Sequence, residues 1–209
     1  DVFKGDSFIL DLGDHYVGHL SFKLDNVDDF IDAPTKLTIK FGEDMNEIND
    51  DFSKYNGTLS RMWLQEEGVI IDYPMTVNMQ RRYSCRYIKV TVDETNKPVR
   101  LYDFVFTAST SANPEKLNKA DISDPILKKI DEIAAKTLRD CMQTFFEDGP
   151  KRDRRLWIGD LRLEALTNYC TYNNSEIVKR SLYLFAAGEC NALGFLPSYI
   201  YETPYYFSG

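Results

Sequence analysis

Residues that serve metal and disulfide chemistry are scarce in this sequence. It has two histidines, His15 and His19, and four widely spaced cysteines that form no Cys-x-x-Cys pair. A metal site is therefore not expected. Isolated cysteines of this kind are usually buried free thiols, and they favour a reducing compartment such as the cytoplasm. The compartment itself is left open.

Positive charge and long apolar runs are also scarce. The net charge is −8, and the one dense basic run, 151–155, is interrupted by Asp153. Nucleic acid is therefore not expected as a partner, because a phosphate backbone requires a clustered basic face. No stretch reaches the roughly 18 apolar residues that span a membrane. The chain begins at Asp1 without a methionine, and we expect it to be part of a longer protein.

The first half of the sequence consists of short runs in which polar and apolar residues alternate. In 36–41, for example, lysine and threonine alternate with Leu37, Ile39 and Phe41. Such alternation places one face of a strand on a core and the other in water. Turn residues separate the runs, as at 11–14. We expect an antiparallel β-sandwich, with strands at 7–12, 18–24, 37–41, 68–72, 87–92 and 101–108.

The apolar spacing becomes helical after a polar connector at 109–114. Asp124 and Pro125 are typical of a helix start, as cap and first helical residue, and the Gly-Pro pair at 149–150 would end that helix. Its apolar residues recur at three- and four-residue spacings: Ile126, Leu127, Ile130, Ile133, Ala134, Leu138 and Met142.

Two more helices are expected, one beginning near Asp160 and one capped by Asn174. Three helices cannot easily bury their apolar faces alone. The second half is therefore interpreted as a bundle or as the opening of a larger helical array.

The segment 147–160 joins the first two helices and concentrates charge. It holds four acidic residues, four basic residues and Trp157 within 14 residues. Cleavage of a glycosidic bond needs one carboxylic acid to protonate the leaving oxygen and a second carboxylate, so this loop is a candidate site. A charged loop between helices is nevertheless more often a solvated, salt-bridged turn, and Trp157 is as often a core residue as a sugar-binding one.

The same segment resembles the signature of family-78 glycoside hydrolases, the bacterial α-L-rhamnosidases, in which Asp-Cys-Pro-Gln-Arg-Glu leads on to Gly-Trp-Thr-Gly-Asp. The matching residues, without a gap, are Asp148, Pro150, Arg152, Trp157, Gly159 and Asp160. Residues 11–18 are similar to the Asp-Phe-Gly-Gln-Asn-x-x-Gly opening of the family's sandwich. Residues 37–43 resemble its strand ending in Gly-Glu, and 82–92 its Arg-Tyr-x-x-Val strand.

This resemblance implies a β-sandwich at 1–110, followed at 111–209 by the first helices of an (α/α)6 catalytic barrel, a six-hairpin glycosidase. It implies inverting hydrolysis of terminal α-L-rhamnosyl residues in the full-length parent, without a cofactor. The substrate would be a rhamnosylated glycoside or oligosaccharide. The family's general base lies in later barrel helices, so we expect these 209 residues alone to be inactive.

The resemblance also assigns roles to residues of the loop. Asp153 stands where the family has its general acid, a glutamate. Asp148 and Asp160 match acids of the sugar pocket, Arg152 matches a neighbouring arginine, and Trp157 suits the apolar face of the sugar. Aspartate is one methylene shorter, and a reach error of about 1 Å can lower a rate on the order of 100-fold. Nearby carboxylates favour protonated Asp153 and nearby arginines its ionised form, and the sequence leaves the balance open.

Two alternatives remain. In one, the chain is a carbohydrate-binding module whose sandwich binds sugar while the helices merely cap it. In the other, it is a homologue that has lost catalysis, which the aspartate at position 153 keeps open. A binding module has no need of three carboxylates (Asp148, Asp153 and Asp160) converging on one pocket, whereas a hydrolase does.

Overall fold

The computed structural model describes residues 1–27, 32–201 and 207–208. The chain divides into two compact units, which we call the first unit (1–108) and the second unit (109–209). Among the described residues, no helix has both the length and the apolar character needed to cross a membrane.

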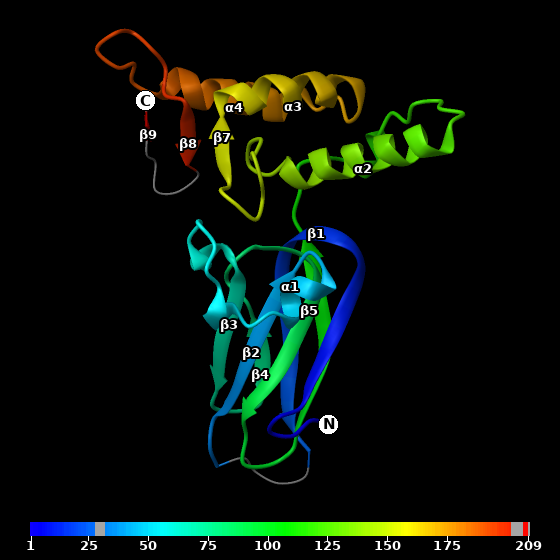
Figure 1. Cartoon of the computed structure of the whole chain (residues 1–209), viewed down its shortest axis with the longest axis vertical. Helices are drawn as coiled ribbons and strands as arrows, with labels where there is room; N and C mark the ends of the chain where they lie inside the picture. The colour runs from blue at the N-terminus through cyan, green and yellow to red at the C-terminus, as the bar shows by residue number, and fades with distance from the viewer. Residues whose placement is uncertain (28–31, 202–206, 209) are drawn as a thin grey trace. The chain divides into compact units, whose positions relative to one another are not determined.

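The first unit is an antiparallel β-structure with six strands among its described residues (Figure 1). The strands pair in the order β3-β2-β5-β1-β4, and β6 also pairs with β1. A short helix, α1 (Met45–Asn49), lies between β2 and β3. The strand bounds are β1 (Ser7–Asn26), β2 (Thr35–Gly42), β3 (Gln65–Ile71), β4 (Met75–Asn78), β5 (Tyr83–Glu94) and β6 (Val99–Ala108). The expected sandwich class is confirmed.

Strand β1 corrects one prediction, because the turn expected at 11–14 does not interrupt it. The pairing of β1 with β5 shifts register between Asp11 and Tyr16. Gly13 has a φ of +79° there, and its N–H donates to Asp11 Oδ1 over 2.8 Å. A glycine in this conformation lets a strand bulge and bend without ending. The two strands expected at 7–12 and 18–24 are therefore one strand, which arches over the unit in Figure 1.

The core of the first unit follows the alternation seen in the sequence. Leu37, Ile39 and Phe41 of β2 are all fully buried, as predicted. Phe41 stacks on Tyr83 with ring centroids 3.6 Å apart. Strand β4 and helix α1 were not predicted, because four or five residues are too short to show a period.

The second unit contains three helices among its described residues, at the predicted places. Asp124 caps α2 and Asn174 caps α4, each by accepting two backbone N–H bonds. Two strands pair beside the helices, and β9 (Phe207–Ser208) extends the pair. The bounds are α2 (Pro125–Cys141), β7 (Arg155–Trp157), α3 (Ile158–Cys170), α4 (Ser175–Ala187) and β8 (Tyr199–Tyr201).

Helix α2 begins as predicted but differs from the prediction in where it ends and in how much of its apolar stripe is buried. It ends at Cys141 and not at 149–150, because the Glu147 N–H returns to the Cys141 carbonyl oxygen over 2.9 Å and closes a turn. Its apolar stripe is buried only in its C-terminal half. Leu138 is 6% exposed, whereas Ile126 and Ile130 are 70% and 57% exposed.

Two of the four cysteines match the expectation of buried thiols and two do not. All four are free; Cys85 and Cys141 are buried, whereas Cys170 and Cys190 are exposed. Cys85 lies on the inward face of β5, and Cys141 on the buried side of the last turn of α2. Cys170 is the last residue of α3 and lies outside the core. The spacing of the cysteines in the sequence could not predict this exposure.

Candidate functional site

The loop from Asp148 to Arg155 is closed on itself by its end residues. The Asp148 N–H donates to the Arg155 carbonyl oxygen over 2.9 Å, and Asp148 Oδ1 accepts from the Arg155 N–H over 3.0 Å. Gly149 is required here, because a Cβ at this position would collide with the Arg152 carbonyl oxygen. Arg154 adopts a positive φ of 63° and donates from Nε to the Pro150 carbonyl oxygen. The loop is thus held in place by hydrogen bonds among its own residues.

Asp153, the predicted acid, is held inside this loop. Its side chain is 8% exposed and forms an ion pair with Arg155, with Nη1 and Oδ2 2.9 Å apart. Arg152 Nε lies farther away, 3.9 Å from Oδ1. Asp153 is therefore fixed mainly by one arginine, through one of its two oxygens.

Asp148 combines a structural and a chemical role. Although the residue as a whole is exposed, desolvation of its carboxyl raises its pKa, and the nearby charge of Asp153 adds to the rise. Backbone N–H groups of Arg155, Gly149 and Asp153 act in the opposite direction by bonding to the charged form. The raised pKa shows that burial and like charge outweigh these bonds.

The other predicted residues lie at the end of the loop and the start of α3. Trp157 is half-buried, immediately precedes α3 and tilts against Tyr199, with ring centroids 4.5 Å apart. Asp160 is exposed in the first turn of α3, where a negative charge is favoured by the helix dipole. Arg152 has a side chain that is 47% exposed.

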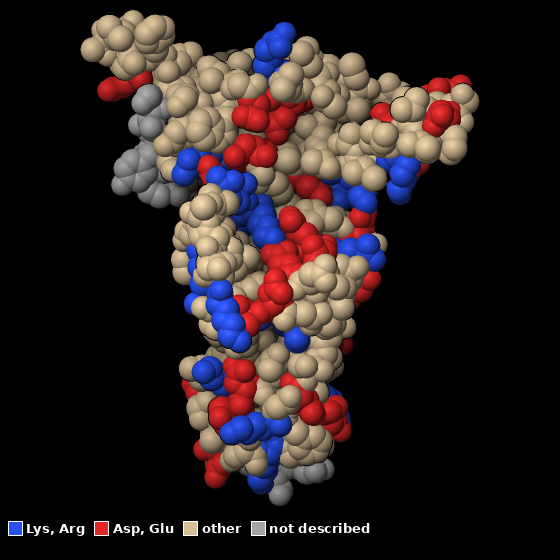
Figure 2. All heavy atoms as spheres, viewed as in Figure 1, with Lys and Arg blue, Asp and Glu red and all other residues tan. Residues whose placement is uncertain are grey.

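Two further acids of this region were missed by the sequence analysis. Glu164 lies one turn after Asp160 on α3, so both project from one helix face. Burial raises the pKa of Glu164 to about 8, helped by the charges of Asp160, Asp148 and Glu147. Glu147 is fully buried. Figure 2 shows acidic side chains gathered on the second unit near β7 and α3. The four-residue spacing of Asp160 and Glu164 was the signal available in the sequence.

Strand β8 supplies aromatic side chains that were also missed. Arg155 pairs with Tyr201 and Trp157 with Tyr199 in the β7–β8 register. Residues 202–206, which follow β8, lie outside the described residues. Local sequence offered no sign that this segment would pair with the charged loop, because the pairing is between positions far apart in the chain.

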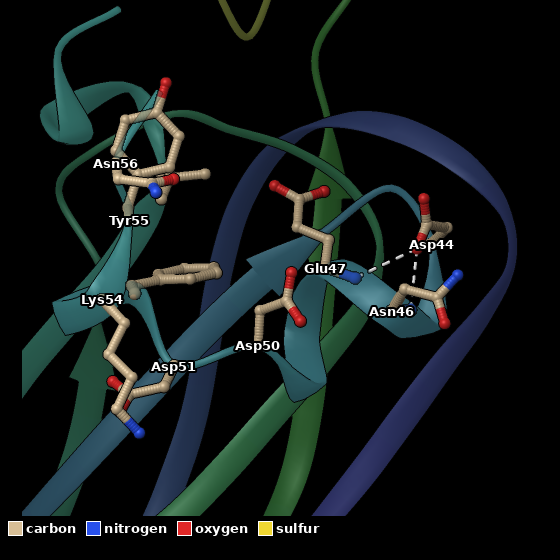
Figure 3. Close-up of a pocket in the computed structure, with 10 residues that line it drawn as sticks. Asp44, Asn46, Glu47, Asp50, Asp51, Lys54, Tyr55 and Asn56 are labelled. Carbon is tan, nitrogen blue, oxygen red and sulfur yellow. Dashed lines mark hydrogen bonds and ion pairs between the residues drawn. The ribbon is translucent and has the colours of Figure 1, made fainter. Parts of the chain in front are cut away.

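The first unit has a pocket of its own, and no predicted site residue is among those that line it. It has a volume of about 640 Å³ and lies between α1 and the stretch around Phe52 and Tyr55 (Figure 3). Asp44 caps α1 through the N–H groups of Asn46 and Glu47. The full lining is Asp44, Asn46, Glu47, Asp50, Asp51, Phe52, Lys54, Tyr55, Asn56 and Leu64. Carboxylates, an amide and an exposed tyrosine can bind sugar hydroxyls and ring faces.

Within the described ranges, no group of three or more histidine, cysteine, aspartate or glutamate side chains is arranged to hold a metal ion. The second unit places the buried Glu147 and the nearly buried Asp153 in the same loop region. Such groups can transfer protons and accept hydrogen bonds from a polyhydroxylated ligand.

Comparison with known protein families shows which family the chain is related to. Residues 1–111 match the model of the glycosyl hydrolase family 78 alpha-rhamnosidase N-terminal domain. The chain belongs to glycosyl hydrolase family 78. Residues 116–206 match the bacterial alpha-L-rhamnosidase 6 hairpin glycosidase domain. The family resemblance in the sequence is thereby confirmed.

Comparison with solved structures leads to the same family. This family-78 chain is similar to a rhamnosidase from Klebsiella oxytoca with rhamnose bound, at 42% identity and a TM-score of 0.92, over 98% of this chain and 40% of that one. It is also similar to the GH78 family rhamnosidase of Bacillus sp. GL1, at 26% identity and a TM-score of 0.69, over 88% of this chain and 18% of that one. The chain thus spans less than half the length of either. No curated protein matches it.

Proposed function

We propose that the full-length protein hydrolyses terminal α-L-rhamnosyl residues with inversion, and that Asp153 is its general acid. One observation carries the proposal. Asp153 is a nearly buried carboxyl at the family's acid position, in a chain that is 42% identical to a rhamnosidase with rhamnose bound. The substrate is a rhamnosylated glycoside or oligosaccharide.

In this mechanism, Asp153 gives its proton to the glycosidic oxygen as the bond to the sugar breaks. A general base, placed by this proposal outside these 209 residues, activates water on the opposite face of the ring. Asp148 and Asp160 accept hydrogen bonds from sugar hydroxyls and stabilise the positive charge that develops on the ring. Arg152 donates to a hydroxyl oxygen, and Trp157 packs against the apolar face of the sugar.

The roles of the two parts of the chain belong to the same proposal. Residues 1–110 act as the β-sandwich domain and 111–209 as the first part of the catalytic barrel. Because this proposal places the base outside these 209 residues, the isolated chain should show no turnover of any rhamnoside. Measurable hydrolysis by this chain alone would refute that placement of the base.

The test is hydrolysis of p-nitrophenyl α-L-rhamnoside by the full-length protein and its Asp153→Asn variant. An amide cannot donate the proton, so kcat/KM should fall by roughly 100- to 10,000-fold. Asp121→Asn, an exposed aspartate of the same unit, is the matched control and should leave the rate unchanged. An active wild type with an equally active Asp153→Asn variant would remove Asp153 from the acid role.

A second candidate function is sugar binding without hydrolysis, and the pocket of the first unit favours it. Calorimetric titration of L-rhamnose distinguishes the two sites. Binding in the second unit should weaken in Asp148→Asn, which keeps an oxygen to accept the Arg155 N–H. Binding in the first unit should weaken instead in Tyr55→Ala. Binding lost only in Tyr55→Ala, in a protein without hydrolysis, would support the binding module.

A further inference from the structure

Strands β7 and β8 fix the side chain of Arg155 from across a strand pair. In their antiparallel register, Arg155 lies opposite Tyr201 and diagonally across from Tyr199. Because side chains alternate along a strand, these three share one face. The other face carries Leu156 and Ile200, both fully buried. A slip by one residue would expose this apolar pair, so the register is strongly set.

The guanidinium group of Arg155 is enclosed by aromatic rings on that face. Its Cζ lies 4.5 Å from the ring centroid of Tyr201, 4.7 Å from that of Tyr199 and 6.0 Å from that of Trp157. These are distances at which a cation is attracted to a ring face. The Arg155 side chain is 22% exposed. An arginine held in this way has little freedom to leave its place.

The same guanidinium is the close partner of the proposed acid. Nη1 of Arg155 is 2.9 Å from Asp153 Oδ2, whereas the nearest Arg152 nitrogen is 3.9 Å from Oδ1. When Asp153 is protonated, its unprotonated oxygen is the better hydrogen-bond acceptor, so the contact with Arg155 favours Oδ2 as that oxygen. The proton is then carried by Oδ1.

We propose that Arg155 is a positioning residue for Asp153. It holds Oδ2 and so reserves Oδ1 as the oxygen that donates the proton. The inference rests on the proposed function, in which Asp153 is the acid. As the Oδ1–H bond breaks, the proton moves to the glycosidic oxygen, the bond between this oxygen and the sugar carbon breaks with its electron pair on oxygen, and the carboxylate left on Asp153 is stabilised by Arg155.

The experiment compares pH–rate profiles and leaving-group dependence in the full-length protein. The variants are Arg155→Met, Arg155→Lys and Tyr201→Leu. Arg162→Met is the matched control, because Arg162 is exposed and lies on the face of α3 opposite Asp160. Each protein is assayed on a phenyl and on a dinitrophenyl α-L-rhamnoside. Thermal unfolding of each variant is measured beside the kinetics.

Arg155→Met should lower kcat on the phenyl rhamnoside by about 10- to 100-fold. It should lower kcat on the dinitrophenyl rhamnoside far less, because that leaving group needs little protonation. Loss of the positive charge favours the protonated acid, so the alkaline limb of the profile should move up by about one pH unit. Arg155→Lys keeps the positive charge, so the alkaline limb of its pH–rate profile should lie at the wild-type pH. Tyr201→Leu should shift both readouts in the direction of Arg155→Met.

If Arg155→Met lowered kcat equally on both substrates and left the alkaline limb of the pH–rate profile unchanged, the positioning role would be overturned, because a purely structural defect has these effects. Wild-type behaviour of a folded Arg155→Met would overturn it too, while loss of activity in Asp153→Asn would leave the proposed function standing. A folded wild type that hydrolyses no rhamnoside would overturn both.

Discussion

At the scale of single residues, four acidic side chains of the second unit lie near one buried thiol, that of Cys141. Burial raises the pKa of the Cys141 thiol, and the charges of Glu164, Glu147, Asp140 and Asp148 raise it further. These acids therefore surround one buried point. One oxygen of Glu164, Oε2, is buried and makes no hydrogen bond to the residues that the structure describes. Because its carboxyl is buried beside other acids, Glu164 is neutral at pH 7.

The pH dependence of stability should report on Glu164. Its pKa is about 8 in the folded chain, against an ordinary value of 4.5. The folded state thus binds the proton more tightly than the unfolded state. Its contribution to stability is complete below pH 4.5, falls as the pH rises, and is lost above about pH 8. The loss is about 5 kcal/mol at most.

Glu164→Gln removes this titration while keeping the shape of the neutral side chain. Urea unfolding at pH 6 and pH 9 should show a smaller loss of stability in the variant than in the wild type. Glu176→Gln, which changes an exposed acid paired with Lys179, serves as the control. Equal losses in wild type and Glu164→Gln would show that Glu164 ionises as an ordinary glutamate.

At the scale of elements, the starts of α2 and α4 are set by single side chains. Asp124 Oδ1 accepts from the N–H groups of Ile126 and Leu127 over 2.8 and 3.0 Å. Asn174 does the same for α4, and its Nδ2 also donates to the Ser111 carbonyl oxygen over 2.8 Å. The Asn174 side chain therefore both begins a helix and ties down the connector that opens the second unit.

Substitution of the two caps should separate these contributions. Asp124→Ala should lower the free energy of unfolding by about 1 kcal/mol. Asn174→Ala should lower it by about 2 kcal/mol, because the bond to Ser111 is lost as well. Asn174→Asp keeps the cap alone and should fall between. Chemical denaturation measures the free energy of unfolding of all three variants. If Asn174→Ala lost no more stability than Asp124→Ala, the bond from Asn174 to Ser111 would contribute nothing.

At the scale of the whole molecule, each unit has its own hydrophobic core. Phe22 lies in the core of the first unit and Phe146 in that of the second, and both are fully buried. Every residue of the first core precedes 109, and every residue of the second follows it. Two cores of this kind can unfold separately.

Calorimetry should show this independence as two unfolding transitions. Phe22→Ala should destabilise one transition by about 3–5 kcal/mol and leave the other in place, and Phe146→Ala should do the reverse. A single transition that both substitutions lower equally would mean that the units fold as one.

Much of the fold could be predicted because its signals are local. Alternation along 36–41 and the caps at Asp124 and Asn174 act within a few residues, and the structure has the elements they indicate. The turn expected at 11–14 was wrong because a glycine can bend a strand without ending it. The end of α2 was wrong because the Glu147 N–H closes an earlier turn, a bond that the Gly-Pro signal does not include.

The candidate site shows the same difference between local signals and long-range contacts. The sequence by itself determined the family, the two-part fold and the loop that carries Asp153, because these follow from local patterns and a motif. Only the tertiary structure decided that Arg155 holds one oxygen of Asp153, that Tyr199 and Tyr201 enclose Arg155, and that Glu164 is desolvated. Strand pairing and burial join residues far apart in the chain, and their free energy depends on the environment that folding creates and not on neighbours in sequence.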